Sequence, residues 1–326
     1  AHGLACVGGV RGRQEAGPPR PAARKHMDSR SGPGRDVNGF RGSAGGGYVP
    51  PVPIVPLHGH AALRRRLLDA AGRGALPASL LLQGPRGVGK QRLALWLGQA
   101  LLCTTAIAER PDGAPCDWCQ ACRYARDCSH PDLHWYFPRP RLKDGDASPA
   151  EVQADYAAAR AERVERQGLY PPAPGTEGLY VATVRALVQQ AAFSPALGRR
   201  KVFVVGDAER MVPQEGADAG ANAFLKLLEE PPADTVLILT SSEPGALLPT
   251  IRSRVVSVRV APLPEADVRA FLADPAVAPA FASEPADALV ARAGGAPGTL
   301  LAGREQAAAS AEAERLLRAV LEGNRA

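Results

Sequence analysis

Long hydrophobic runs are absent from this sequence of 326 residues. No apolar stretch approaches the roughly 20 residues that a membrane-spanning helix needs, which excludes an integral membrane helix. The first residues also lack the charged start, apolar core and cleavage site that mark a secretory signal. We therefore expect a cytoplasmic protein.

Charge of one sign is scarce in most of the chain, although the formal net charge is +6. Residues 1–50 contain eight Arg or Lys against three Asp or Glu, which leaves residues 51–326 nearly neutral at +1. Any contact of the main part of the chain with DNA would therefore depend on a local basic patch or on partner subunits.

Apolar periodicity is missing from the N-terminal segment. Residues 1–50 hold twelve glycines and five prolines, and a segment of this composition cannot bury a hydrophobic core. We predict a disordered Gly/Arg/Pro-rich tail over residues 1–52 and assign it no function.

A glycine-rich turn follows the first short apolar run, Leu80-Leu81-Leu82-Gln83. The turn reads Gly84-Pro85-Arg86-Gly87-Val88-Gly89-Lys90-Gln91 and leads into an amphipathic segment. Strand, loop and helix in this order are the context of a phosphate-binding loop, in which backbone N–H groups surround an anion and Lys90 reaches the outer phosphates. The candidate nucleotide-binding residues are Gly84, Gly87, Gly89, Lys90 and Gln91.

Position 91 departs from that pattern. A phosphate-binding loop usually carries Ser or Thr there, whose hydroxyl ligates Mg²⁺, whereas this chain has the longer carboxamide of Gln91. ATP is therefore a candidate ligand of this loop, whereas its hydrolysis here is less expected. The alternative is a glycine-rich turn that binds no ligand.

Strands and helices alternate beyond this loop. Such alternation predicts an α/β fold with a doubly wound parallel sheet of five strands. Strands are expected over residues 80–82, 132–137, 201–205, 235–240 and 255–260, and helices over 61–72, 92–103, 180–193, 214–230 and 247–252.

The domain organisation follows from these elements. We predict an α/β domain over residues 53–261, which includes a charged surface insertion at 138–178 that contains one helix over 150–167. Residues 262–303 form a small helical lid domain, with helices near 265–272 and 285–292. The Ala-rich segment 304–326 is expected to be helical.

Five of the six cysteines fall between positions 103 and 128, which in a chain without a secretory signal favours metal binding over disulfides. The run Cys116-Asp-Trp-Cys119-Gln-Ala-Cys122 contains two C-x₂-C steps, and Cys103 lies thirteen positions upstream. Four thiolates suit a closed, structural Zn²⁺ site. We predict Cys103, Cys116, Cys119 and Cys122 as zinc ligands in a module over residues 103–131. Cys128 and His130 are alternatives to Cys103, and free thiols or a redox pair are alternatives to the metal.

Taken together, these motifs resemble the bacterial clamp-loader AAA+ family, and most closely its delta-prime members. The resemblance covers roughly residues 54–303 and implies an AAA+ P-loop module that works in a ring of subunits. In the family this ring opens the sliding clamp and places it on primed DNA. The matching features are the phosphate-binding loop, the cysteine spacing, His130-Pro131-Asp132, Asn222-Ala223-Phe224-Leu225-Lys226-Leu227-Leu228-Glu229-Glu230-Pro231-Pro232 and Arg252-Ser253-Arg254.

The resemblance also implies that this member hydrolyses little or no ATP. Active members have an acidic pair after the third core strand, where one carboxylate orients Mg²⁺ and the other activates water. This chain has Gly206 and Asp207 there. Active members also sense the γ-phosphate through an Arg in the lid, and Pro297 stands at that position. With Gln91, these are three separate losses.

One implied catalytic residue remains, Arg254. In the family the corresponding arginine projects into the ATP site of a neighbouring subunit and stabilises the transferred phosphoryl group. Here it stands in Ser253-Arg254-Val255. A pair of solvated charges flanking a turn is the alternative interpretation. Ser241 or Ser242 would occupy the sensor position after the fourth strand.

The implied partners are gamma/tau-type and delta-type subunits, the sliding clamp and primer-template DNA through the assembled complex, with no membrane. The family continues into a helical collar domain, so residues 304–326 are expected to be the start of a truncated collar.

Two alternative functions remain open. A catalytically active gamma/tau-type ATPase would carry Ser or Thr after Lys90 and an acidic pair after the 201–205 strand. A P-loop nucleotide kinase with a zinc-bearing lid would leave Arg254 and residues 222–232 unexplained.

Overall fold

Residues 1–48 lie outside the residues that the structure describes, and the description below concerns the unit formed by residues 49–326. The expected tail over 1–52 and the helix expected after residue 304 likewise stay predictions. No helix in the described part is long and apolar enough to cross a membrane. The computed structural model describes residues 54–142, 147–171, 175–211, 218–304 and 315.

A five-stranded sheet forms the centre of the larger unit, in the order β2-β3-β4-β1-β5. Every neighbouring pair is parallel, which confirms the predicted parallel five-stranded sheet. β3 and β4 are buried along their whole length because helices cover both faces. The strands are β1 (Ser79–Gln83), β2 (Leu133–Tyr136), β3 (Lys201–Val205), β4 (Thr235–Ser241) and β5 (Val256–Arg259).

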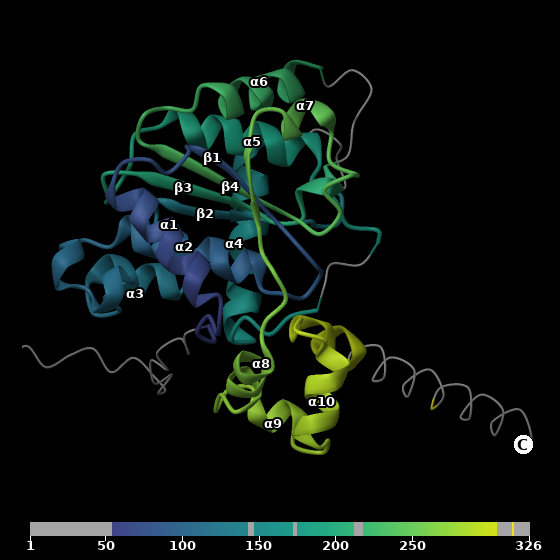
Figure 1. The fold of residues 1–326 in the computed structure, drawn as a ribbon. Coiled ribbons are helices and arrows are strands. Elements are labelled where there is room, and N and C mark those ends of the chain that lie inside the picture. Colours follow the sequence, from purple (N-terminus) through teal and green to yellow (C-terminus); the bar gives the residue numbers. More distant parts are fainter. Residues whose placement is uncertain (1–53, 143–146, 172–174, 212–217, 305–314, 316–326) are drawn as a thin grey trace, which may run out of the picture. The chain divides into compact units, whose positions relative to one another are not determined.

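Helices lie on both faces of this sheet, with α1 and α2 on one side and α5 and α6 on the other (Figure 1). α2 can approach the strands closely because it carries Gly98, where a Cβ atom would lie 2.7 Å from the Leu133 side chain. α2 begins at Lys90, directly after the loop that follows Gln83, so its N-terminus lies at the carboxyl end of β1. The helices are α1 (Ala61–Gly72), α2 (Lys90–Leu102), α5 (Val181–Ala192), α6 (Asp218–Glu229) and α7 (Pro249–Arg252).

The predicted surface insertion at 138–178 needs correction at its helix, α4 (Pro149–Glu165). One side of α4 joins the main hydrophobic core, where Val152 and Tyr156 are each 1% exposed. The Tyr156 hydroxyl donates a hydrogen bond to the Phe137 carbonyl at 2.6 Å. The helix therefore covers the sheet beside β2, and an apolar stripe within a charged segment makes this packing possible.

Four further α-helices belong to the described part of the chain. α3 (Gln120–Arg126) lies within the cysteine segment. Beyond β5, three short helices share a hydrophobic core of their own around Val268, Phe281 and Leu289, each buried. They are α8 (Glu265–Leu272), α9 (Ala278–Phe281) and α10 (Ala286–Ala293).

Candidate functional site

The loop between β1 and α2 needs its glycines for reasons of backbone geometry. Gly87 and Gly89 have φ of +79° and +93°, which side chains other than glycine rarely adopt. At Gly84 a Cβ atom would lie 2.2 Å from the Val260 carbonyl oxygen. The backbone of the loop thus requires glycine at positions 84, 87 and 89, three of the candidate nucleotide-binding positions.

Lys90 is folded back onto this loop. Its Nζ donates to the carbonyl oxygens of Gly84 at 3.0 Å and Pro85 at 2.8 Å, and to Ser242 Oγ at 2.8 Å. An ammonium group has three N–H donors, so all three are in use. Ser242 is thus the serine that contacts the loop, whereas Ser241 is the last residue of β4.

Two acidic side chains face the Lys90 ammonium. Burial lowers the pKa of Lys90 to about 8, although the charges of Asp207 and Glu209 oppose this shift. Burial raises the pKa of Asp207, and the neighbouring Glu209 raises it further. Glu209 also accepts a hydrogen bond from the Ser242 amide at 2.9 Å. The sequence analysis did not single out Glu209, which follows β3 in a 3₁₀ turn, Ala208–Arg210.

The Gln91 carboxamide fills the space beside Gly206. Its Oε1 accepts from Trp135 Nε1 at 3.1 Å, and its Nε2 donates to Asp207 Oδ2 at 3.2 Å. A Cβ atom on Gly206 would lie 2.5 Å from the Gln91 carboxamide carbon. Two positions expected to be separate losses are therefore one packed arrangement, in which Gln91 occupies the room that a side chain at position 206 would need.

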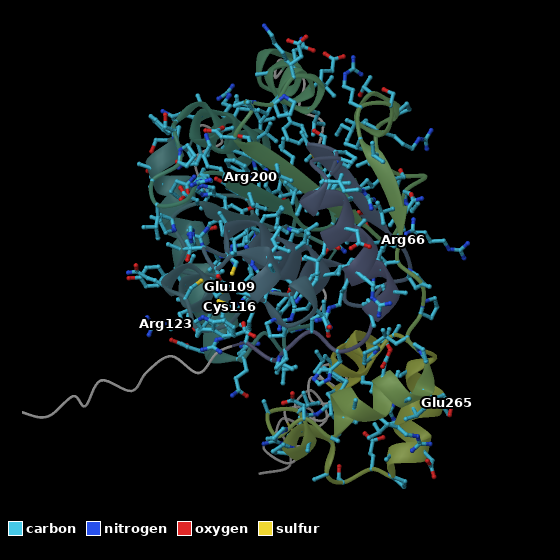
Figure 2. All side chains as sticks on the ribbon, turned by 60° about the vertical axis from the view of Figure 1, so that its left-hand side comes forward. Arg66, Glu109, Cys116, Arg123, Arg200 and Glu265 are labelled. Atoms are coloured by element: carbon cyan, nitrogen blue, oxygen red, sulfur yellow. The ribbon has the colours of Figure 1, made fainter. Side chains whose placement is uncertain are left out.

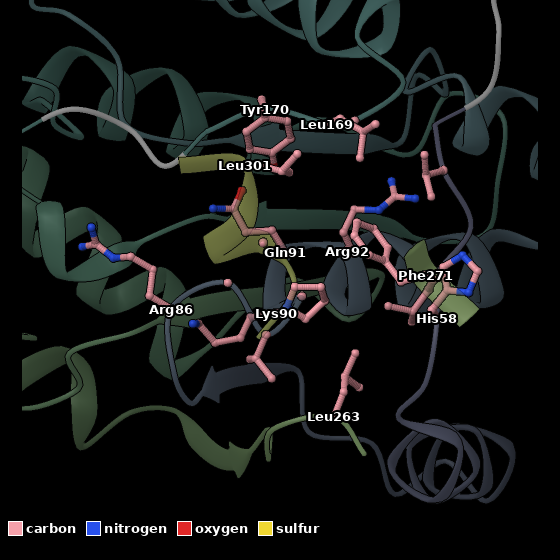
Figure 3. Close-up of a pocket in the computed structure, with 18 of the residues that line it drawn as sticks. His58, Arg86, Lys90, Gln91, Arg92, Leu169, Tyr170, Leu263, Phe271 and Leu301 are labelled. Atoms are coloured by element: carbon pink, nitrogen blue, oxygen red, sulfur yellow. The ribbon is translucent and has the colours of Figure 1, made fainter. Parts of the chain in front are cut away.

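A cavity of about 170 Å³ opens beside the loop (Figure 3). Pro297 lines it, and the Gly298 amide donates to the Gly87 carbonyl at 2.9 Å. The segment in which active members carry the sensor arginine is thus in direct contact with the phosphate-binding loop. The apolar walls include Val55, Leu57, Leu169, Leu263, Phe271 and Leu301.

The four predicted zinc ligands come together in one group, in which all sulfur atoms lie within 4.8 Å of one another. Cys103 Sγ lies 3.9 Å from Cys119 Sγ, and Cys116 Sγ lies 3.8 Å from Cys122 Sγ. A tetrahedral Zn²⁺ site with bonds of about 2.3 Å separates its sulfurs by about 3.8 Å. This cluster, of which Figure 2 labels Cys116, could therefore bind a metal ion.

Hydrogen-bond donors around the cluster stabilise thiolates. The amides of Cys119 and Cys122 donate to the sulfurs of Cys116 and Cys119 at 3.3 and 3.4 Å, and Thr105 Oγ1 donates to Cys116 at 3.1 Å. Although burial opposes it, hydrogen bonds from Thr104 and the Cys122 amide help to lower the pKa of Cys119 to about 5. Burial raises the pKa of Cys122. A bound cation would relieve this conflict by allowing every sulfur to be a thiolate.

Neither alternative fourth ligand joins the group among the described residues. Burial raises the pKa of the Cys128 thiol to about 11, and its side chain belongs to the main core. His130 Nδ1 accepts from the Asp132 amide at 3.0 Å. Asp132 in turn fixes the loop before β3, because its carboxylate accepts hydrogen bonds from the amides of Ala196, Leu197 and Gly198.

Arg254 lies between α7 and β5, next to the C-terminal end of α6. Its Nε donates to Glu229 Oε1 at 2.6 Å, and its Nη1 donates to the Thr250 carbonyl at 2.8 Å. Its side chain is 28% exposed. The arginine is therefore held by Glu229, a partner that the sequence analysis did not identify. A role in a neighbouring subunit stays a prediction.

Comparison with known proteins adds an independent observation. A family model described as "DNA polymerase III, delta subunit" matches residues 59–264. The chain is 34% identical over 230 residues to DNA polymerase III subunit delta' of Pseudomonas aeruginosa, a match that covers 69% of this chain and 55% of that protein. It is 30% identical over 206 residues to DNA polymerase III subunit gamma/tau of Mycobacterium bovis, covering 63% and 28%. The chain thus spans about half the length of the delta' relative.

Among solved structures, a DNA polymerase III gamma subunit-related protein from Thermotoga maritima shares 22% identity with this chain. The alignment covers 68% of this chain and 53% of the other, with a TM-score of 0.38. A likeness at this level carries no argument about function.

Proposed function

The chain belongs to the family described as DNA polymerase III, delta subunit, and on that premise we propose that it is a delta-prime-like subunit of a bacterial clamp loader. In this role it is an AAA+ scaffold that assembles with gamma/tau-type and delta-type subunits. It helps to place the sliding clamp on primer-template DNA and hydrolyses little or no ATP itself. Sequence identity to a delta' protein supports this assignment.

The carboxamide of Gln91 is the observation that carries the non-hydrolysing role. An active P-loop site holds Mg²⁺ through a Ser or Thr hydroxyl and a nearby carboxylate. Here both ends of the Gln91 carboxamide are hydrogen-bonded, and the space beside Gly206 is full. Without a place for the metal, charge that develops on the transferred phosphoryl group would not be neutralised within this subunit.

Arg254 is the residue through which this subunit would act on ATP, in the site of a neighbouring subunit. Its Nε donates to Glu229 and its Nη1 to Thr250, so Nη2 is the nitrogen that makes no hydrogen bond within the described part of the chain. A guanidinium held in this way is preorganised for a phosphoryl group, and such fingers contribute a rate factor of about 10³–10⁵.

We also infer that the cysteine cluster holds a structural zinc ion. Four thiolates complete the tetrahedral coordination that Zn²⁺ prefers and leave no open position for chemistry. The ion would fix the geometry of the module, while the catalytic steps belong to other residues.

The experiment that tests the proposal is ATP turnover of a reconstituted loader that contains this subunit, stimulated by DNA and the sliding clamp. We expect Arg254→Ala to lower turnover by tenfold or more, because a neighbouring site loses its finger. Lys90→Ala should leave turnover nearly unchanged. If Lys90→Ala instead removes one site's share of turnover, the subunit is itself an ATPase.

That second outcome corresponds to a gamma/tau-type ATPase. The observation in its favour is the 30% identity to a gamma/tau protein, together with the intact Gly89-Lys90 step in the loop. The packing of Gln91 against Gly206 argues against it.

A further inference from the structure

A second cation, Arg92, lines the same cavity as Lys90 but lies in a different part of it. Figure 3 shows its guanidinium directed away from Lys90 and toward the side of the cavity where Phe271 and His58 lie. Gly168 lies close to the guanidinium, since a Cβ atom there would be 3.5 Å from Arg92 Nη1. The arginine therefore lies in a part of the cavity whose walls include apolar side chains.

Arg92 has no anionic partner among the described residues. No hydrogen bond or ion pair links its guanidinium to that part of the chain, and its electrostatic neighbours are Tyr170 and Cys128. Burial raises the pKa of the Tyr170 hydroxyl and raises that of Cys128 to about 11, so both are neutral at pH 7. A guanidinium remains charged in proteins. The Arg92 side chain is half-buried in the cavity wall, so an anion bound beside it would offset the cost of its partial desolvation.

Two further arginines increase the positive potential around this position. Arg163 stacks on the Tyr170 ring, with its guanidinium carbon 3.8 Å from the ring centroid, and its Nη1 is buried without a hydrogen bond among the described residues. Arg160 interacts electrostatically with the same Cys128 thiol as Arg92. Burial lowers the pKa of each of the three guanidinium groups. The fold thus gathers three arginines around Tyr170 and Cys128. The carboxylate that lines the cavity, Asp207, interacts with Lys90 and Arg163 and is not among the electrostatic neighbours of Arg92.

We propose that the cavity binds a small organic anion through Arg92, without a divalent metal. The guanidinium would take a carboxylate or phosphate group, whose oxygens match its planar donors. The adjoining walls of Val55, Leu169 and Phe271 would take an apolar or aromatic body of about one ring, which suits a cavity of about 170 Å³. The ligand is therefore an anion with an aromatic or apolar body.

The proposed anion site is distinct from the phosphate-binding loop. Lys90 donates to Gly84, Pro85 and Ser242 at the loop, whereas Arg92 makes no such contact with the described residues and lies in another part of the cavity. This inference does not depend on a role in clamp loading, and it can fail or succeed independently of that role.

The test is isothermal titration calorimetry of the full chain in EDTA, with phenyl phosphate and benzoate as probes and inorganic phosphate as the comparison. We expect at least one aromatic probe to bind more tightly than inorganic phosphate, and Arg92→Gln to weaken it by tenfold or more. Arg66→Gln, the same change on the exposed surface of α1 (Figure 2), should alter the affinity less than twofold. The two probes distinguish a phosphate ligand from a carboxylate ligand.

A stability measurement keeps the proposal falsifiable if neither probe is the right shape. Arg92→Met removes an uncompensated charge and keeps a shorter, unbranched apolar side chain, so we expect the melting temperature of the unliganded chain to rise by about 2 °C or more. A lower melting temperature would identify Arg92 as a structural residue and overturn the proposal. Binding that requires Mg²⁺, that Arg92→Gln leaves unchanged, or that inorganic phosphate matches would overturn it as well.

Discussion

Gln91 and Gly206 depend on each other, because the side chain of one occupies the space that the other leaves empty. From the sequence, each position departs from the family pattern for its own reason. The structure links them through a contact between α2 and the end of β3. The effect of a substitution at either position on stability therefore depends on the residue present at the other.

This dependence leads to a first prediction for Gly206→Ala. The new methyl group would displace the Gln91 carboxamide and break its hydrogen bonds to Trp135 and Asp207, at a cost of about 1–2 kcal/mol in the free energy of unfolding. In a Gln91→Ala background the same change should cost less than about 0.5 kcal/mol. Urea denaturation of the four proteins measures the coupling, and equal costs in the two backgrounds would contradict the packing.

A second prediction concerns His134 in β2, whose ring stacks on Phe203 with centroids 4.7 Å apart. Burial, aided by the charge of Arg160, lowers its pKa to about 4. Between pH 6.5 and pH 4 the unfolded chain therefore binds a proton that the folded chain does not, and stability falls as the pH falls. The loss between pH 7 and pH 5 is about 2 kcal/mol.

The matched variant for this prediction is His134→Phe, which keeps an aromatic ring but cannot be protonated. Chemical denaturation at both pH values should give a smaller loss for the variant than for the unmodified chain. Acid effects on the cysteines are common to both proteins and cancel in the difference. An equal loss would show that His134 is not the group responsible.

At the scale of elements, the cysteine module differs from the rest of the fold because its interior consists of the cysteines themselves. Arg110 supports it from the side, donating to the carbonyl oxygens of Ala100, Cys103 and Thr105. In the same module Ala121 and Ala125 of α3 are also buried, and Ala125 joins the main core. The arrangement of the four cysteines therefore depends on the cluster itself, while α3 keeps apolar contacts of its own.

A third prediction follows for Cys103→Ser. The variant should lose stoichiometric zinc, measured by atomic absorption after gel filtration, because one of four ligands is gone. Cys128→Ser, which alters a buried thiol outside the group, should retain it. Hydrogen exchange should then accelerate in α3 but not in β3. Retention of zinc by Cys103→Ser and its loss by Cys128→Ser would reassign the fourth ligand.

The elements that sequence reasoning predicted well are those with a strong apolar period. α1, β3 and α8 have the predicted bounds, because each is flanked by clear turn residues. α3 and α9 were not predicted, since each is too short for a period to be visible. The end of α2 and the order of the strands depend on tertiary contacts that local patterns do not contain.

In the candidate sites, too, local patterns were predictable and tertiary contacts were not. Spacing predicted the four cysteines as one group, because C-x₂-C steps constrain the backbone locally. It could not find the contacts of Gln91 with Trp135 or of Arg254 with Glu229, which join residues far apart in the chain. Arg92 was also missed, because a single basic residue on a helix has no signal until the cavity around it is known.

At the scale of the whole molecule, Glu229 connects the end of α6 to the arginine that would act on a neighbouring subunit. The ion pair is partly exposed, with side-chain exposures of 28% for Arg254 and 47% for Glu229. Such a pair adds little to stability. We expect the ion pair to act instead by fixing the orientation of the Arg254 guanidinium.

A fourth prediction is that Glu229→Gln lowers ATP turnover of the reconstituted loader by roughly tenfold, since a misplaced catalytic group loses much of its effect. The loss should be no larger than that of Arg254→Ala, and stability should change by less than about 1 kcal/mol. Glu230→Gln, a neighbouring exposed glutamate, is the control and should leave turnover unchanged. Faster turnover in Glu229→Gln would mean that the pair restrains the arginine.

The position of β1 has a consequence for how the chain acquires its fold during synthesis. β1 pairs with β4 and β5, as in the register of Ser79 with Leu237 and of Leu80 with Val256. As the chain leaves the ribosome, this apolar strand stays unpaired until most of the domain has been synthesised, because β4 and β5 come later in the sequence. Pairings so distant in sequence form slowly, and an unpaired apolar strand is a site for aggregation. Slow translation before β4 would therefore lengthen the interval in which a chaperone is needed.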